Sequence, residues 1–232
     1  MKIAIMQPYF FPYIGYFQLI NSVDRFIIFD DVNYIKKGWI NRNRILLNGS
    51  EHLFTLPVKN ASQNKYIKEI MLDDPAKWKS KFTKTLVAAY KKTPNFEPVL
   101  KLITNLLDIN EYSLSKFVTN SIKGICSYLN IKTRIVETSS VYNTINLKKD
   151  DKIISICKQE NAQEYINPIG GKDLYSEKLF RRKGISIKFH LAKEIIYKQN
   201  INTFIPNLSI IDMLMYNNHE FIISSLNQYE LL

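Results

Sequence analysis

The sequence predicts an α/β protein with a mainly parallel central sheet of the Rossmann-like, doubly wound kind, carrying a β-hairpin and a helical insert at about residues 75–130. Three observations lead to this class. A strand, a helix and a second strand open the chain, strands and helices alternate again between residues 133 and 189, and the segment between these parts contains long stretches of helical periodicity. We expect residues 1–232 to form one α/β domain with this insert.

The opening unit supplies two strand ends. An apolar strand is expected at residues 2–6, a helix from about 12 to 22, and a second strand at 25–29. Gln7 follows the first strand and Asp30-Asp31 follow the second. Parallel sheets bind ligands at the carboxyl ends of their strands, so these side chains are expected at a site.

A hairpin is predicted next, because two β-like runs at residues 44–47 and 52–57 are joined by Asn48-Gly49. The loop before it, KKGWINRNR, concentrates cations, amides and one aromatic side chain. Arg42 is a candidate to hold a phosphate or carboxylate, and Trp39 to stack on a base or sugar ring. A polar loop with Trp39 packed in the core is the alternative.

Helices are expected through the insert. Asp74-Pro75 reads as a cap followed by a first-turn proline, and Trp78, Phe82 and Tyr90 recur at helical spacing, which favours core packing. Two further helices are predicted at about 97–107 and 113–129.

The second half returns to alternating elements. We expect strands at 133–138, 164–167 and 185–189, and helices at 150–159 and from 174 to 182. In the loop PIGGKD, Gly170-Gly171 would let backbone amides approach an anion, and Lys172 adds a charge. A plain tight turn explains the glycine pair equally well.

The last motif is SIIDMLMYN, in which Ser209 and Asp212 have the S-x-x-D spacing of a capping box. That pattern predicts a helix beginning at Ser209.

Composition limits the function classes. The net charge is +11, but the Lys and Arg residues are scattered and no nucleic-acid-binding motif accompanies them. We therefore expect the binding partner to be an anionic small molecule or a carrier protein instead of nucleic acid.

Cys126 and Cys157 sit among apolar residues and are expected to be buried and reduced. The three histidines lack metal-ligand spacing, and no metal is predicted. With no long apolar run and no signal-peptide pattern, a cytoplasmic location is expected.

The strand-to-helix spacing of the opening unit loosely resembles that of nucleotidylyltransferases and pantothenate synthetases, although Gly15 is followed by Tyr16 and not by histidine. A longer resemblance is carried by QPYFFPYIGYFQLI, DRFIIFDDVNYIKKGWINRNRIL, YINPIGGKDLY and FIPNLSIIDML. With these blocks the chain resembles the WbqC-like family, whose members look like products of O-antigen and other surface-polysaccharide gene clusters. Some members are linked to the attachment of amino-acid-derived acyl groups to amino sugars.

The resemblance implies an enzyme that transfers an acyl or aminoacyl group to the amine of a nucleotide-linked amino sugar. No resident cofactor is implied, and the expected donor is an acyl thioester on coenzyme A or on an acidic acyl carrier protein. Two alternatives stay open: a nucleotidylyl or adenylate-forming transferase, and a non-catalytic module that binds sugar nucleotides.

We expect all the predicted site residues to meet in one cleft. Those predicted to act in catalysis are Gln7, Asp30, Asp31 and Tyr16. Those predicted to bind substrate are Tyr9, Pro12, Trp39, Asn41, Arg42, Gly170, Gly171, Lys172, Asp173, Tyr175, Ser209 and Asp212.

Overall fold

A computed structural model describes all 232 residues and contains a six-stranded sheet in the order β10-β9-β8-β1-β2-β7. All neighbouring strands are parallel except β9 and β10. The prediction of an α/β protein with a mainly parallel central sheet is therefore confirmed. The strands are β1 (Lys2–Met6), β2 (Arg25–Ile28), β7 (Arg134–Val136), β8 (Glu164–Pro168), β9 (Ser186–Ala192) and β10 (Tyr229–Leu231).

The strand order reverses beside β1. From β1 the chain adds β2 and then β7 on one side, and it then returns to place β8 on the other side of β1. Lys2 of β1 pairs with Glu164 of β8, and Met6 of β1 pairs with Ile28 of β2. Connections that leave β1 and β8 in opposite directions open a crevice at the carboxyl ends of these two strands.

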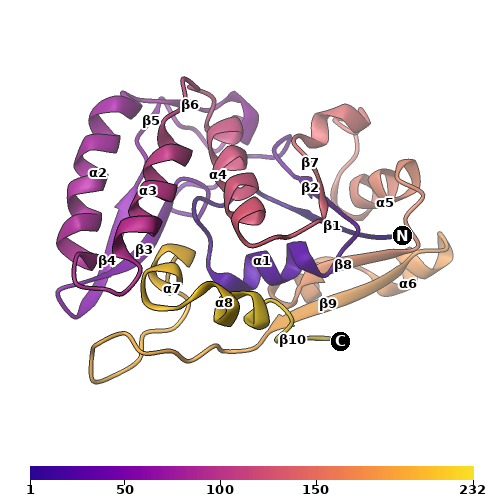
Figure 1. The fold of residues 1–232 in the computed structure, drawn as a ribbon. Helices are drawn as coiled ribbons and strands as arrows, with labels where there is room; N and C mark the ends of the chain where they lie inside the picture. The colour runs from indigo at the N-terminus through magenta and orange to yellow at the C-terminus, as the bar shows by residue number, and fades with distance from the viewer.

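Helices cover both faces of the sheet. Ala4 and Phe26 belong to a large apolar cluster with α1 (Ile14–Asn21) and α4 (Leu114–Tyr128). The residues next to them, Ile3 and Ile27, belong to a second cluster with α5 (Lys149–Gln159) and α6 (Glu177–Arg182). The alternation follows from the two-residue period of a strand. In Figure 1, α5 and α6 lie at the right, where the amino terminus also lies.

The hairpin and the first two helices of the predicted insert form a layer at the left of Figure 1, whereas α4, the third helix of the insert, packs on the sheet. Strands β3 (Arg42–Leu47) and β4 (Ser50–Thr55) meet at Asn48 and Gly49, whose φ angles of 52° and 77° suit the predicted tight turn. Two helices pack beside them, α2 (Pro75–Tyr90) and α3 (Phe96–Leu107).

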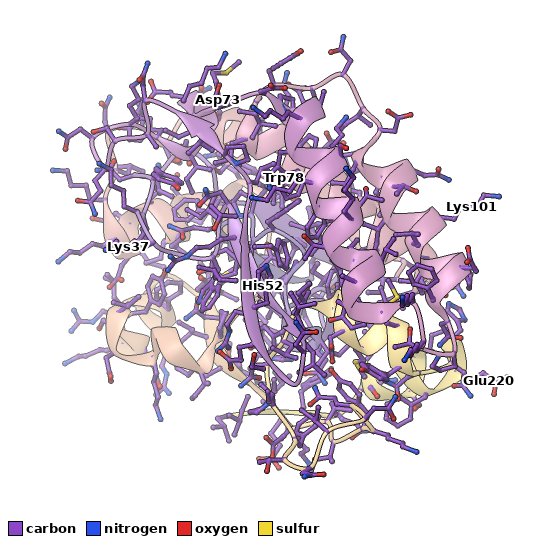
Figure 2. The ribbon with its side chains drawn as sticks, turned by 90° about the vertical axis from the view of Figure 1, so that its left-hand side faces the viewer. Lys37, His52, Asp73, Trp78, Lys101 and Glu220 are labelled. Carbon is purple, nitrogen blue, oxygen red and sulfur yellow. The ribbon has the colours of Figure 1, made fainter.

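Trp78 of α2 helps to join this layer to the rest of the molecule. Its ring stacks on Phe82 at 4.7 Å between centroids and contacts Phe10 at 5.6 Å. Figure 2 views the layer face on, with Trp78 between α2 and the hairpin, whereas Lys37 and Lys101 point outward. The prediction that the insert's aromatic stripe is core is confirmed for Phe82 and Tyr90, which are buried.

The remaining elements are short. They are β5 (Val58–Lys59), β6 (Met71–Leu72), α7 (Ile210–Tyr216), α8 (His219–Ser225) and the 3₁₀ segments Ile67–Glu69, Ser139–Tyr142 and Ile169–Leu174. None of the helices combines the length and apolar character needed to cross a membrane.

Two local predictions are wrong. The helix expected from residue 174 begins only at Glu177, because a 3₁₀ segment occupies Ile169–Leu174. Ser209 is the N-cap of α7, as expected, and its hydroxyl accepts from the Ile211 N–H at 3.3 Å, but the reciprocal bond from Asp212 that would complete a capping box does not form. The Asp212 carboxylate instead accepts hydrogen bonds from Tyr90 (2.7 Å), Tyr197 (2.7 Å) and Gln199 (3.1 Å), since a fully buried carboxylate needs several donors.

Candidate functional site

A cavity of about 490 Å³ opens at the carboxyl ends of β1 and β8, where the strand order reverses. We call it the switch-point cavity. It is lined by Ile5, Met6, Gln7, Tyr9, Phe29, Val32, Ile35, Asn167, Pro168, Gly170, Gly171, Leu174 and Tyr175. Five of the predicted site residues therefore lie around one cavity: Gln7, Tyr9, Gly170, Gly171 and Tyr175.

Gln7 is held from behind by Tyr16. The buried Tyr16 hydroxyl donates a hydrogen bond to the Gln7 carbonyl at 2.8 Å, and burial raises the pKa of Tyr16 well above its ordinary value. Tyr16 does not line the cavity. Its role in the structure is to fix the turn after β1. The amide of Gln7 can donate and accept hydrogen bonds, but it is not a base at neutral pH.

Asn167 also lines the cavity, at the end of β8, the strand that pairs with β1. Its Oδ1 accepts from the Tyr165 hydroxyl at 2.9 Å, and its Nδ2 donates to the Pro168 carbonyl at 3.0 Å. A Cβ at Gly171 would stand 2.1 Å from Asn167 Nδ2, whereas a Cβ at Gly170 would meet nothing within 4 Å. Gly171 therefore makes room for the Asn167 amide.

The rest of the GGKD loop points elsewhere. Lys172 and Asp173 are exposed and do not line the switch-point cavity. The Lys172 ammonium lies 6.0 Å from the centroid of the Phe189 ring. Tyr175 packs edge-on against Tyr165 and Phe180 while lining the switch-point cavity.

Tyr9 separates the switch-point cavity from a second one of about 260 Å³, which we call the Trp39 cavity. Burial, with a smaller effect of Tyr13, raises the pKa of Tyr9, so its phenol is protonated at neutral pH and donates hydrogen bonds. The Trp39 cavity is lined by Tyr9, Pro12, Tyr13, Trp39, Asn43, Arg44 and Asn207.

Trp39 and Arg44 form the mixed aromatic and cationic wall of this cavity. Trp39 is 39% exposed, and the Arg44 guanidinium carbon lies 5.3 Å from its ring centroid. Arg44 also pairs with Glu51 at 2.8 Å on the rim. The alternative that Trp39 is packed in the core is wrong.

Arg42 does not reach this cavity's lining. Its Nε donates to the Gly38 carbonyl at 3.0 Å and its guanidinium also bonds the Lys37 carbonyl, so its donors hold its own loop. Asn41 is buried, accepting from Tyr34 and donating to Leu56, both at 2.8 Å. Sequence reasoning missed Arg44, although it lies two residues along the same strand and therefore on the same side as Arg42.

Ser209 and Asn43 clamp the turn that carries Tyr9 and Pro12. Phe11 has a φ of 42°, which is unfavourable for a non-glycine residue. Its carbonyl accepts from Asn43 Nδ2 at 2.8 Å and from Ser209 Oγ at 2.7 Å, and Asn43 Nδ2 also reaches the Phe10 carbonyl at 3.1 Å. These buried bonds impose the strained turn and so shape both cavities.

Asp30 and Asp31 are buried behind the site. Asp30 accepts from Ser115 and Thr138, each at 2.7 Å, and Asp31 accepts from the Ser139 hydroxyl. Neither aspartate lines the switch-point cavity. Both hold the end of β2 against the segment that follows β7.

Asp31 instead borders a third cavity of about 280 Å³, which we call the lysine cavity. Its lining is Phe29, Asp31, Val32, Asn33, Tyr66, Ile145, Leu147, Lys148, Lys149, Lys152, Ile153 and Tyr175. Phe29, Val32 and Tyr175 also line the switch-point cavity, so these two cavities adjoin. Lys148 and Lys149 are not among the predicted site residues, and nothing in the local sequence signals the cavity beside them.

The cysteines lie outside all three cavities. Cys126 and Cys157 are buried and free, and burial raises the pKa of each thiol to about 12. The prediction that both are buried and unpaired is confirmed. A thiol with such a pKa is a poor nucleophile at neutral pH.

The predicted residues thus divide among neighbouring cavities and the residues that support them, instead of meeting in one cleft.

Residues 7–223 match the WbqC-like protein family. A curated relative, "Uncharacterized protein Rv1507c" of Mycobacterium tuberculosis (strain ATCC 25618 / H37Rv), is 31% identical over 216 residues, which is 92% of each chain. No solved structure matches. The chain belongs to the WbqC-like protein family.

Proposed function

We propose that this protein binds a nucleotide-linked amino sugar and transfers an acyl or aminoacyl group to its amine, as a step of bacterial surface-polysaccharide (O-antigen) biosynthesis. The observation that carries the proposal is that the switch-point cavity and the Trp39 cavity share Tyr9. A ligand with a sugar at one end and a planar base at the other fits two adjoining cavities of this chemistry. We interpret the sheet as Rossmann-like and doubly wound, the arrangement in which such crevices bind nucleotides.

In this proposal the sugar occupies the switch-point cavity. The amides of Gln7 and Asn167 and the phenols of Tyr9 and Tyr175 offer donors and acceptors that match sugar hydroxyls and an amine. The base stacks on Trp39, and Arg44 takes the role first given to Arg42, because its guanidinium borders the cavity and suits a phosphate.

The reaction requires little from the protein beyond placement. The neutral amine of the sugar attacks the carbonyl carbon of an acyl thioester, the new C–N bond forms as the C–S bond breaks, and the thiolate leaves and receives the proton released by nitrogen. Because a neutral amine is already nucleophilic, holding it against the thioester supplies much of the rate. Gln7 is the residue we assign to orient the amine.

One observation favours a second candidate, the non-catalytic sugar-nucleotide module. The polar groups that line the switch-point cavity are amides and protonated phenols, while Asp30 and Asp31 have their hydrogen bonds filled elsewhere. Such a lining binds a sugar whether or not chemistry follows.

The test is an assay of the purified protein with UDP- or dTDP-linked amino sugars and acyl-coenzyme A, followed by mass spectrometry for an N-acylated product. Gln7→Ala is expected to lower kcat/KM roughly tenfold or more, the value of one lost hydrogen bond to a charged or reacting group. Gln228→Ala, at an exposed position, serves as the matched control.

Binding without turnover of any thioester would support the module instead. Product formation that requires a nucleoside triphosphate and magnesium would support the nucleotidylyl alternative.

A further inference from the structure

The lysine cavity is the part of the molecule that the proposed sugar nucleotide leaves unused. The lysine cavity adjoins the switch-point cavity along Phe29, Val32 and Tyr175. The Trp39 cavity adjoins the switch-point cavity along Tyr9. The switch-point cavity therefore has two neighbours: the Trp39 cavity, which has one arginine among its aromatic side chains, and the lysine cavity, which has three lysines. A second ligand entering through the lysine cavity would reach the place assigned to the sugar.

Of the three lysines that line this cavity, one is paired with a carboxylate and two are exposed. Lys152 is buried, with Nζ 2.9 Å from the Asp31 carboxylate and 2.8 Å from the Asp31 carbonyl, so its charge is already neutralised. Lys148 and Lys149 are exposed on the cavity wall. These two ammonium groups are the ones available to an anion.

The start of α5 adds to this positive field. Lys148 is the N-cap residue of this eleven-residue helix and makes no side-chain capping bond, so the first-turn N–H groups lack a side-chain acceptor. The nearest opposing charges on the helix are Asp150 and Asp151, neither of which lines the cavity. Asp150 is turned toward the Ser176 N–H, which it accepts at 3.3 Å.

Apolar groups surround these lysines. Ile145 and Leu147 are 54% and 38% exposed on the same wall, and Phe29 and Val32 continue the apolar surface into the switch-point cavity. This sequence of surfaces suits a ligand that begins with a phosphate and continues as an uncharged, flexible arm.

We propose that the lysine cavity binds the phosphate of a phosphopantetheine thioester, whose arm passes Phe29 and Tyr175 to bring the thioester into the switch-point cavity. This inference rests on the proposed function, since it names the donor for that acyl transfer. Coenzyme A and a modified acyl carrier protein both present this chemistry.

The test is calorimetric titration of the full-length protein with 4′-phosphopantetheine and with pantetheine, which lacks the phosphate. The wild type is expected to bind 4′-phosphopantetheine roughly tenfold or more tightly than pantetheine, and Lys148→Ala/Lys149→Ala to lose that preference, because charged hydrogen bonds are worth this much. Lys91→Ala/Lys92→Ala removes an equally exposed lysine pair at the end of α2 and is expected to change nothing.

Titrations with coenzyme A and with a phosphopantetheinylated carrier protein identify the source, and tight binding of either that depends on Lys148 and Lys149 supports the inference. No preference for the phosphate, or the same preference in the double variant, would overturn it. The sugar nucleotide is titrated separately: if it fails to bind while the lysines still select the phosphate, the proposed function falls and the phosphate site stands.

Discussion

At the scale of single residues, Asn43 shows how one side chain can line the Trp39 cavity and also hold the backbone around it. Its amide reaches the Phe10 and Phe11 carbonyls, and its Oδ1 accepts the Arg44 N–H at 2.8 Å. Because Asn43 is buried, the Phe10 carbonyl and the Arg44 N–H would lose this partner without it, and the Phe11 carbonyl would keep only the Ser209 hydroxyl. The asparagine thus links the strained first turn to β3.

Asn43→Ala is therefore expected to destabilise the protein by about 3 kcal/mol, from buried donors and acceptors that lose their partner. Urea unfolding followed by circular dichroism measures the change. Asn105→Ala, on the exposed side of α3, is the control and should stay within about 0.5 kcal/mol of wild type. Equal stabilities for the two variants would show that Asn43 does not hold the turn.

The buried His190 is expected to make the stability of the protein depend on pH. It is buried, stacks on Tyr229 at 4.6 Å, and has a pKa lowered by burial from 6.5 to about 4. Below pH 6.5 the unfolded chain takes up a proton that the folded protein excludes, so stability is full above pH 6.5 and declines as the pH falls toward 4. His190→Phe keeps an aromatic ring and removes the titration.

We expect the unfolding free energy of wild type to fall more steeply than that of His190→Phe between pH 7 and pH 4.5. Urea titrations across this range give both curves, and parallel curves would contradict the shifted pKa.

At the scale of elements, the β8 turn was predictable in its composition but not in its shape. The glycine pair indicated a close backbone approach, which could serve either an anion or a plain turn. The structure shows a 3₁₀ segment in which Gly171 makes room for the Asn167 side chain. Asn167 was recognised only as a strand end, because the need for space beside it appears when the chain is folded.

Gly170 and Gly171 provide a matched pair of substitutions. Gly171→Ala should displace the Asn167 amide from its bonds to Tyr165 and Pro168 and weaken sugar-nucleotide binding roughly tenfold, the equivalent of one hydrogen bond. Gly170→Ala adds a methyl group to the same cavity lining but meets no protein atom within 4 Å, so it should keep the Asn167 bonds and bind the sugar nucleotide more tightly than Gly171→Ala. Calorimetric titration compares them, and equal affinities would remove Asn167 from the site.

Other elements were predictable because their signals are local. The Asn48-Gly49 turn, the Asp74 cap of α2 and strand β1 follow from patterns within a few residues. Strand β10 and the buried Asp212 network were missed because they depend on partners far away in the sequence. A three-residue edge strand such as Tyr229–Leu231 has no recognisable period of its own.

At the scale of the whole molecule, the sequence correctly predicted that the site residues lie near the ends of parallel strands. It did not predict that they divide among three cavities. The residues that follow β1, β2 and β8 were expected in one cleft, and the ends of these strands do lie side by side, because β8, β1 and β2 are neighbouring parallel strands. The division into three cavities follows from side-chain packing, which places Tyr9 and Tyr175 as shared walls. Period and composition carry no information about such walls.

The proposed function requires that the switch-point cavity holds a nucleotide-linked amino sugar. Thermal unfolding of wild type and Asn167→Leu with amino-sugar nucleotides, their hydroxyl counterparts, and magnesium with nucleoside triphosphates tests it most directly. A ligand at about 100 times its dissociation constant adds about 2.7 kcal/mol of stability, so the midpoint of wild type should rise with the amino-sugar nucleotide. The midpoint of Asn167→Leu, with roughly tenfold weaker binding, should rise only about half as much. A rise with triphosphates alone, or an equal rise in both proteins, would contradict the claim.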